Sequence, residues 1–125
     1  MNLVLDAGAL IGIDRDERRV AGLVELGRRA GATLVTVAPV VGQAWRGGAR
    51  QARLARSLQM IDVRVTSVRE ACTAGELLAT AGTADVVDAL LTMVAVPGDQ
   101  VLTSDPTDLS ELIDHRSISV TVVRV

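Results

Sequence analysis

TADVVDALLTMVAVPGDQVLTSDPTDL, residues 83–109, is the stretch that decides the fold. Its first part has helical spacing, and Thr83 is the expected cap of a helix over residues 84–95. The following PGD predicts a turn, and residues 100–103 predict a short buried strand. Another helix is expected to begin at Pro106, because proline is favoured in the first turn of a helix. Helix, strand and helix in this order are typical of a parallel α/β sheet.

The rest of the chain repeats this alternation. Apolar strands are expected at residues 2–5, 33–37 and 118–124. Residues 61–65 alternate apolar and polar side chains, which indicates an edge strand. Helical spacing and helix-ending glycines fill the segments between the strands. We therefore expect a single domain over residues 1–125, a three-layer α/β/α sandwich around a mostly parallel sheet.

Five aspartates fall where a parallel sheet would gather them. Asp6 and Asp105 follow strands, Asp85 and Asp88 lie one helical turn apart, and Asp108 follows shortly after. Sites in open α/β sheets form outside the carboxyl ends of the strands. Such carboxylates repel one another unless a cation lies among them, and a hard divalent ion suits oxygen ligands. We expect Asp6, Asp88 and Asp105 to hold Mg²⁺ or Mn²⁺, with Asp85 and Asp108 as further ligands.

Several of these acids also have a purely structural interpretation. Asp6 is a possible N-cap, and Asp85 a possible first-turn acid that complements a helix dipole. Asp105 precedes Pro106, where turn aspartates are common. Asp88 is the hardest to explain in this way, because apolar residues surround it and burying a carboxylate is costly.

Composition excludes several classes of protein. Aromatic residues are 1% of the 125 residues, which argues against a base-stacking RNA-binding platform. The single cysteine excludes an internal disulfide and fits a reducing compartment. No segment resembles a secretory leader or a membrane span, so we expect a cytoplasmic protein without membrane contact. The net charge of −2 does not by itself indicate a nucleic-acid binder.

The basic residues are unevenly placed. Arg46, Arg50, Arg53 and Arg56 fall within eleven residues at spacings of four, three and three. They would form one helical stripe if the glycine pair at 47–48 did not break the helix. A solvated helix face is the ordinary interpretation, and a track for an RNA backbone is the alternative.

The N-terminal strand ending in Asp6, the TADVVDA block with Asp85 and Asp88, and the TSDPTDL segment with Asp105 and Asp108 together resemble a PIN domain. Within that family the chain is similar to the VapC-type toxins of toxin–antitoxin pairs. The resemblance runs over essentially the whole chain. It implies a metal-dependent ribonuclease that hydrolyses RNA, is commonly dimeric and is commonly held inactive by an antitoxin protein.

One position departs from the family pattern. The family usually places an acid, most often glutamate, in the third helix, and the matching residue in PVVGQAWRGG is Gln43. An amide offers a neutral oxygen without the charge or basicity of a carboxylate. We expect Gln43, Arg46 and Ser104 to contact the substrate, with the Arg46 guanidinium suited to a phosphate oxygen.

Two rival hypotheses stay open. The first is a PIN-like module that binds RNA or protein and is weakened or inert as an enzyme because of Gln43. The second is a phosphatase or receiver-like phosphoacceptor, which also gathers aspartates at strand ends around Mg²⁺. Many such proteins use a lysine partner, and this chain has none.

Overall fold

The computed structural model describes residues 1–83 and 85–125 and has an α/β architecture. Five strands lie within these residues: β1 (Asn2–Leu5), β2 (Thr33–Val37), β3 (Asp62–Arg64), β4 (Gln100–Thr103) and β5 (Thr121–Arg124). Seven helices lie within them: α1 (Ala7–Asp14), α2 (Arg18–Arg29), α3 (Ala38–Ala44), α4 (Ala52–Leu58), α5 (Val68–Ala81), α6 (Val86–Val94) and α7 (Pro106–Arg116).

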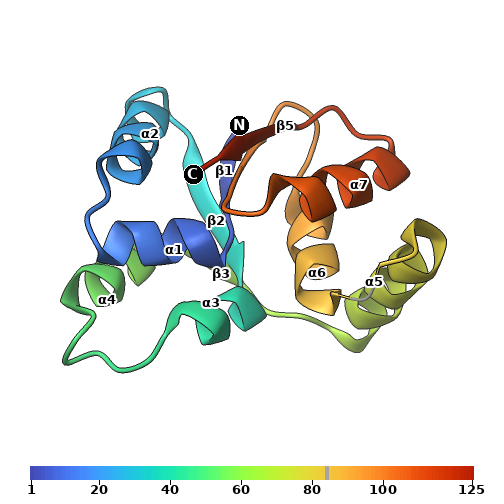
Figure 1. Cartoon of the computed structure of the whole chain (residues 1–125), viewed down its shortest axis with the longest axis horizontal. Coiled ribbons are helices and arrows are strands. Elements are labelled where there is room, and N and C mark those ends of the chain that lie inside the picture. Colours follow the sequence, from blue (N-terminus) through green and yellow to red (C-terminus); the bar gives the residue numbers. More distant parts are fainter. Residues whose placement is uncertain (84) are drawn as a thin grey trace.

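The five strands form one sheet in the order β3-β2-β1-β4-β5, and every neighbouring pair is parallel. Helices α1, α2 and α4 lie on one side of this sheet and α5, α6 and α7 on the other, so the molecule has three layers (Figure 1). The predicted three-layer α/β/α fold is confirmed. Residues 62–64 form an outer strand, as their alternating pattern predicted.

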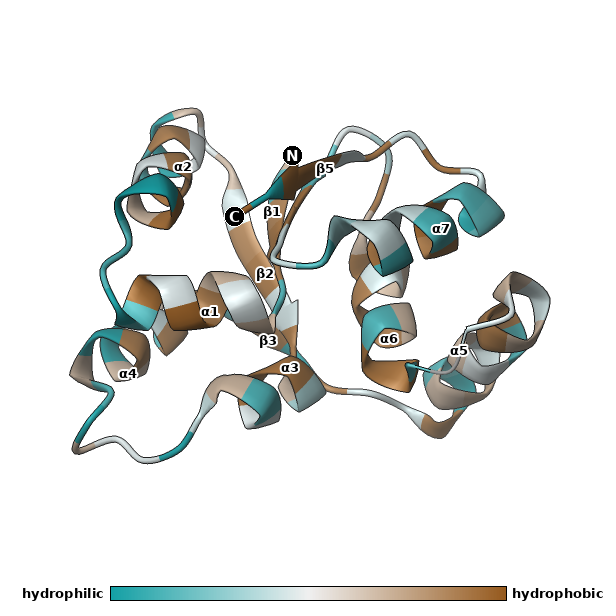
Figure 2. Ribbon diagram, in the orientation of Figure 1, coloured by the Kyte–Doolittle hydropathy of each residue, from teal (hydrophilic) through white to brown (hydrophobic). Residues whose placement is uncertain are grey.

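The core lies along the central strands, whose residues are mostly hydrophobic (Figure 2). Leu3, Val4 and Leu5 of β1 are buried, because helices cover both faces of the sheet. Thr36 is the buried polar residue of β2, and its hydroxyl donates to the Leu5 carbonyl at 2.7 Å. Branched aliphatic side chains therefore build this core almost without aromatic residues.

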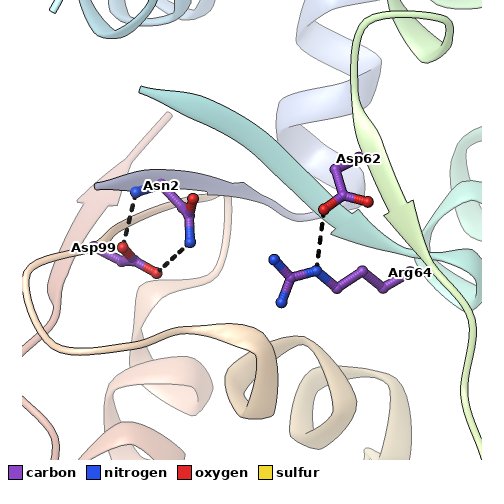
Figure 3. Close-up of polar contacts among 4 residues, drawn as sticks. All are labelled: Asn2, Asp62, Arg64 and Asp99. Atoms are coloured by element: carbon purple, nitrogen blue, oxygen red, sulfur yellow. Dashed lines mark hydrogen bonds and ion pairs between the residues drawn. The ribbon is translucent and has the colours of Figure 1, made fainter. Parts of the chain in front are cut away.

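A buried carboxylate ties the start of β1 to the turn before β4. Asp99 accepts hydrogen bonds from the backbone amide of Asn2 at 2.8 Å, its side-chain amide at 3.2 Å and the Val96 amide at 2.9 Å (Figure 3). Figure 3 also shows the exposed ion pair of Arg64 with Asp62 on β3, at 3.2 Å. A pair so exposed adds little to stability, whereas the buried Asp99 satisfies three donors.

Local signals explain the bounds of α5. Ser67 and Glu70 form a capping box at its start, and Gly82 ends it with a φ of 74°. No single helix among the described residues is long and apolar enough to cross a membrane. Helices α5 and α6 taken together meet that test on length and composition only, across a bend of 109°.

Two local predictions were wrong in detail. The cap of α6 is Asp85 rather than Thr83, because the Asp85 carboxylate accepts from two backbone amides. The predicted start of that helix at Ala84 lies outside the described residues. The last strand begins at Thr121 rather than at residue 118. The helix does break around the glycine pair at 47–48, since α3 ends at Ala44 and α4 begins only at Ala52, so the arginines form no continuous stripe.

Candidate metal centre

The site forms where the order of the strands reverses. The chain passes from β1 outward to β2 and β3, then returns to place β4 on the other side of β1. The carboxyl ends of β1 and β4 therefore flank the crevice in which open α/β sheets bind ligands. Asp6 follows β1 directly, and Asp105 follows β4 by two residues. The topology thus brings these two predicted acids to one edge of the sheet.

Asp6 is 8% exposed and holds both sides of this crevice together. One carboxylate oxygen accepts from the Ala9 amide at 2.9 Å and so caps α1. The other accepts from the Ser104 amide at 3.2 Å, in the turn after β4. The N-cap interpretation of Asp6 is therefore correct. It leaves a ligand role possible, because each carboxylate oxygen has a second lone pair.

Asp88 lies at the centre of the acidic residues. Its pKa is raised from 3.8 to about 6. Burial is the largest cause, and the negative charges of the other four carboxylates follow in the order Asp85, Asp6, Asp108 and Asp105. Carboxylates act on one another in this way only when they lie close together. Asp88 is therefore half-buried and within electrostatic reach of the other four predicted aspartates.

The five carboxylates differ in what already binds them. Asp85 accepts from the amides of Val87 at 2.9 Å and Asp88 at 3.2 Å, as an N-cap does. Within residues 1–83 and 85–125, the carboxylates of Asp88, Asp105 and Asp108 accept no hydrogen bond from the protein. Three acids of the cluster are thus free to bind a cation, and two are engaged by helix amides.

In their present rotamers the acidic side chains do not form a complete metal-coordination site. Among the described residues, no group of three His, Cys, Asp or Glu side chains is arranged to hold a metal ion. The capping bonds of Asp6 and Asp85 explain part of this, because they turn carboxylate oxygens toward backbone amides. The donor chemistry still fits Mg²⁺ or Mn²⁺, which take oxygen ligands and keep several waters. Side-chain rotations would be needed to close the site.

Two residues of the turn after β4 help to shape the site. Ser104 is exposed, and its backbone amide rather than its hydroxyl contacts Asp6. Thr103 belongs to the TSDPTDL motif, but no role in the site was predicted for it from the sequence. Its buried hydroxyl accepts from the Asp105 amide at 2.9 Å and so holds the turn that carries Asp105. The TSD sequence contains the signal, because a threonine two residues before an amide commonly binds it in a turn.

Gln43 and Arg46 lie elsewhere in this structure. They line a pocket of about 250 Å³ together with Asp14 and Arg15, beside the C-terminal end of α1. Asp6 caps the opposite end of that helix, which is about 12 Å long by its residue count. The Arg46 guanidinium donates to the carbonyls of Gly42 at 3.1 Å and Trp45 at 2.6 Å. These bonds place a positive charge at the C-terminal end of α3, where it complements the helix dipole. The substrate roles of Gln43 and Arg46 stay predictions.

A larger cavity lies away from the acids. Its volume is about 560 Å³, and Arg28 of α2 and Arg53 and Arg56 of α4 line it together with apolar residues that include Leu34 and Met60. Two members of the predicted arginine stripe therefore share a surface that is separate from the acidic cluster.

No protein-family model matches this chain, and no curated protein matches it. The similarity to PIN domains therefore stays a prediction from motifs.

Proposed function

We propose that the protein is a Mg²⁺- or Mn²⁺-dependent endoribonuclease similar to the VapC-type toxins. The observation that supports this most strongly is Asp88, whose pKa is raised to about 6 by burial and by the charges of four other carboxylates. Concentrating negative charge at this place destabilises the metal-free protein, and a divalent cation would relieve that repulsion. Capping hydrogen bonds account for Asp6 and Asp85, whereas the carboxylates of Asp88, Asp105 and Asp108 accept no hydrogen bond among the described residues.

On this proposal Asp88, Asp105 and Asp6 hold the metal, and Asp108 and Asp85 supply further negative charge. A divalent ion bound there would supply an acidified water and neutralise charge on a phosphodiester. The protein's own contribution is placement. The Ser104 amide holds one Asp6 oxygen at 3.2 Å, and the Thr103 hydroxyl holds the Asp105 amide at 2.9 Å. RNA would be the substrate, and an antitoxin protein and a second copy of the chain the partners.

The test uses two variants whose native carboxylates bind nothing else among the described residues. Asp88→Asn and Asp105→Asn keep the shape of each side chain and remove its charge. We expect the wild type to bind Mn²⁺ in calorimetry and to cleave RNA only with Mg²⁺ or Mn²⁺. Each variant should lose about 10- to 100-fold in metal affinity and lose cleavage with it. Glu111→Gln, an exposed acid on α7, is the matched control and should behave as wild type.

Two results would contradict the proposal. One is RNA cleavage that continues when the metal is chelated. The other is unchanged metal binding in both Asp88→Asn and Asp105→Asn, which would show that the acids share no site.

A binding module without strong catalysis is the second candidate, and one observation favours it. Helix α3 contains no carboxylate, and the exposed Gln43 stands at the position where the resemblance implies an acid. Replacing Gln43 with glutamate discriminates between the two. A large gain in metal-dependent cleavage would indicate a weakened nuclease site. No gain, with RNA binding intact and cleavage absent in both proteins, would favour the binding module.

A further inference from the structure

Gly8 and Ser104 meet where the start of α1 passes the turn after β4. A Cβ atom on Gly8 would lie 2.6 Å from the Ser104 Cβ and 3.2 Å from its backbone nitrogen, and closer still to its hydroxyl oxygen. Carbon atoms in good contact are about 3.5–4.0 Å apart. No side chain therefore fits at position 8 unless the turn moves.

The part of Ser104 that would collide is the part that cannot move alone. A hydroxyl oxygen can rotate away, but the Cβ and the nitrogen are fixed to the backbone. That same nitrogen donates to the Asp6 carboxylate at 3.2 Å. The next amide, of Asp105, is held by the Thr103 hydroxyl. Displacing this turn would break the contact with Asp6 and shift Asp105 with it.

We propose that Gly8 is a positioning residue for the acidic site. Its missing side chain lets the Ser104 amide approach Asp6, and this contact sets Asp105 and Asp6 in the places from which they bind a metal. The consequence for metal binding rests on the function proposed above, but the contact between residues 8 and 104 does not.

Helix propensity alone predicts that Gly8→Ala is stabilising. Replacing a helical glycine with alanine favours the helix by about 0.8–1.0 kcal/mol. Gly8 lies within α1 and has no positive φ that would strain an alanine. Without the contact to Ser104, Gly8→Ala should therefore be harmless or stabilising. A loss of stability or metal affinity in this variant would thus be due to the collision with Ser104.

The experiment compares the single variant Gly8→Ala with two double variants, in which Gly8→Ala is combined with Ser104→Gly or with Ser104→Ala. The Ser104→Gly and Ser104→Ala single variants are the references. Calorimetry measures Mn²⁺ binding, and a ¹H–¹⁵N spectrum follows the amide at position 104. We expect Gly8→Ala to shift that amide and weaken Mn²⁺ binding by about 10- to 100-fold. Adding Ser104→Gly removes the colliding Cβ, and should leave the amide where it lies in the Ser104→Gly single variant and bring the affinity to within about threefold of wild type. Ser104→Ala keeps the Cβ and should not.

Gly22→Ala is the matched control, because its added Cβ would meet nothing within 4 Å. The proposal is overturned if Gly8→Ala leaves the amide and the Mn²⁺ affinity unchanged, or if Ser104→Ala rescues as well as Ser104→Gly. If Gly8→Ala fails to fold, folding of its Ser104→Gly double variant supports the contact and failure of both contradicts it. If the wild type binds no Mn²⁺, the proposed function fails, and the amide shift still decides whether Gly8 positions the turn.

Discussion

Replacing Asp88 with asparagine should stabilise the metal-free protein at pH 8 while weakening its metal binding. Asp88 is half-buried and lies among four other carboxylates, and both conditions oppose its ionised form. Asparagine keeps the size of the side chain and removes the charge. If Asp88 serves metal binding, its replacement should increase stability and decrease metal affinity. If Asp88 were a structural acid, its replacement should not increase stability.

The direction of the pH dependence follows from the raised pKa. The folded protein holds the Asp88 proton up to about pH 6, whereas the unfolded chain releases it near 3.8. Protonated Asp88 therefore contributes its full stabilisation to the folded protein below about pH 4. This contribution to the free energy of unfolding declines as the pH rises from about 4 to 6, and it is absent above that range. A shift of this size corresponds to about 3 kcal/mol if it is taken in full. Because the side chain is half exposed, solvent screening reduces the expected value to about 1–2 kcal/mol.

Thermal and urea denaturation in chelator should measure this difference between Asp88→Asn and wild type. At pH 8 we expect the variant to be more stable by about 1–2 kcal/mol, or about 4–8 °C in Tm for a chain of this length. The difference should shrink toward zero by pH 4. The same concentration of Mn²⁺ should raise the Tm of the wild type more than that of the variant.

A destabilised Asp88→Asn protein at pH 8, or a stability difference that does not change with pH, would refute this reasoning. Glu111→Gln is the control for the general effect of removing one negative charge. Glu111 is exposed on α7, so its removal should leave stability within about 0.5 kcal/mol at every pH.

Two further substitutions test the fold away from the site. Asp99→Ala should lower the free energy of unfolding by roughly 2–4 kcal/mol in urea titrations, because Asn2 and a further backbone amide lose a buried acceptor; a change below about 0.5 kcal/mol would contradict the importance of these bonds. Gly27→Ala should destabilise by about 1–3 kcal/mol, because its Cβ would lie 3.0 Å from the Leu3 Cγ and closer to one methyl group. An increase in stability, as helix propensity alone predicts, would show that Leu3 repacks freely.

The strands were the most predictable elements, and the reason is burial. Residues 2–5, 33–37 and 100–103 form strands as expected, since short apolar runs between turns have few other stable structures in a parallel sheet. Helix starts were less predictable. Thr83 and Asp85 are both good capping residues, and which of them caps depends on where the chain from α5 turns back.

Some parts of the candidate site were predictable from the sequence and others were not. Asp6 and Asp105 were predictable as neighbours because strand ends converge in any sheet of this topology. The placement of Gln43 and Arg46 was not, because a motif match says nothing of how α3 turns relative to α1. The support that Gly8 gives to the acids depends on a contact with Ser104 across about a hundred residues of sequence. The contact between Thr103 and Asp105 spans only two residues, so the sequence contains its signal.

The sequence by itself determined the alternation of strands and helices and the identity of the acids, because periodicity and residue type are local properties of the chain. The tertiary structure alone decided that Asp88 is the acid with the perturbed pKa. It also decided that the Asp6 carboxylate accepts from the Ser104 amide on the neighbouring turn. The physical reason is that burial and like-charge repulsion depend on distances between segments, which no local pattern encodes.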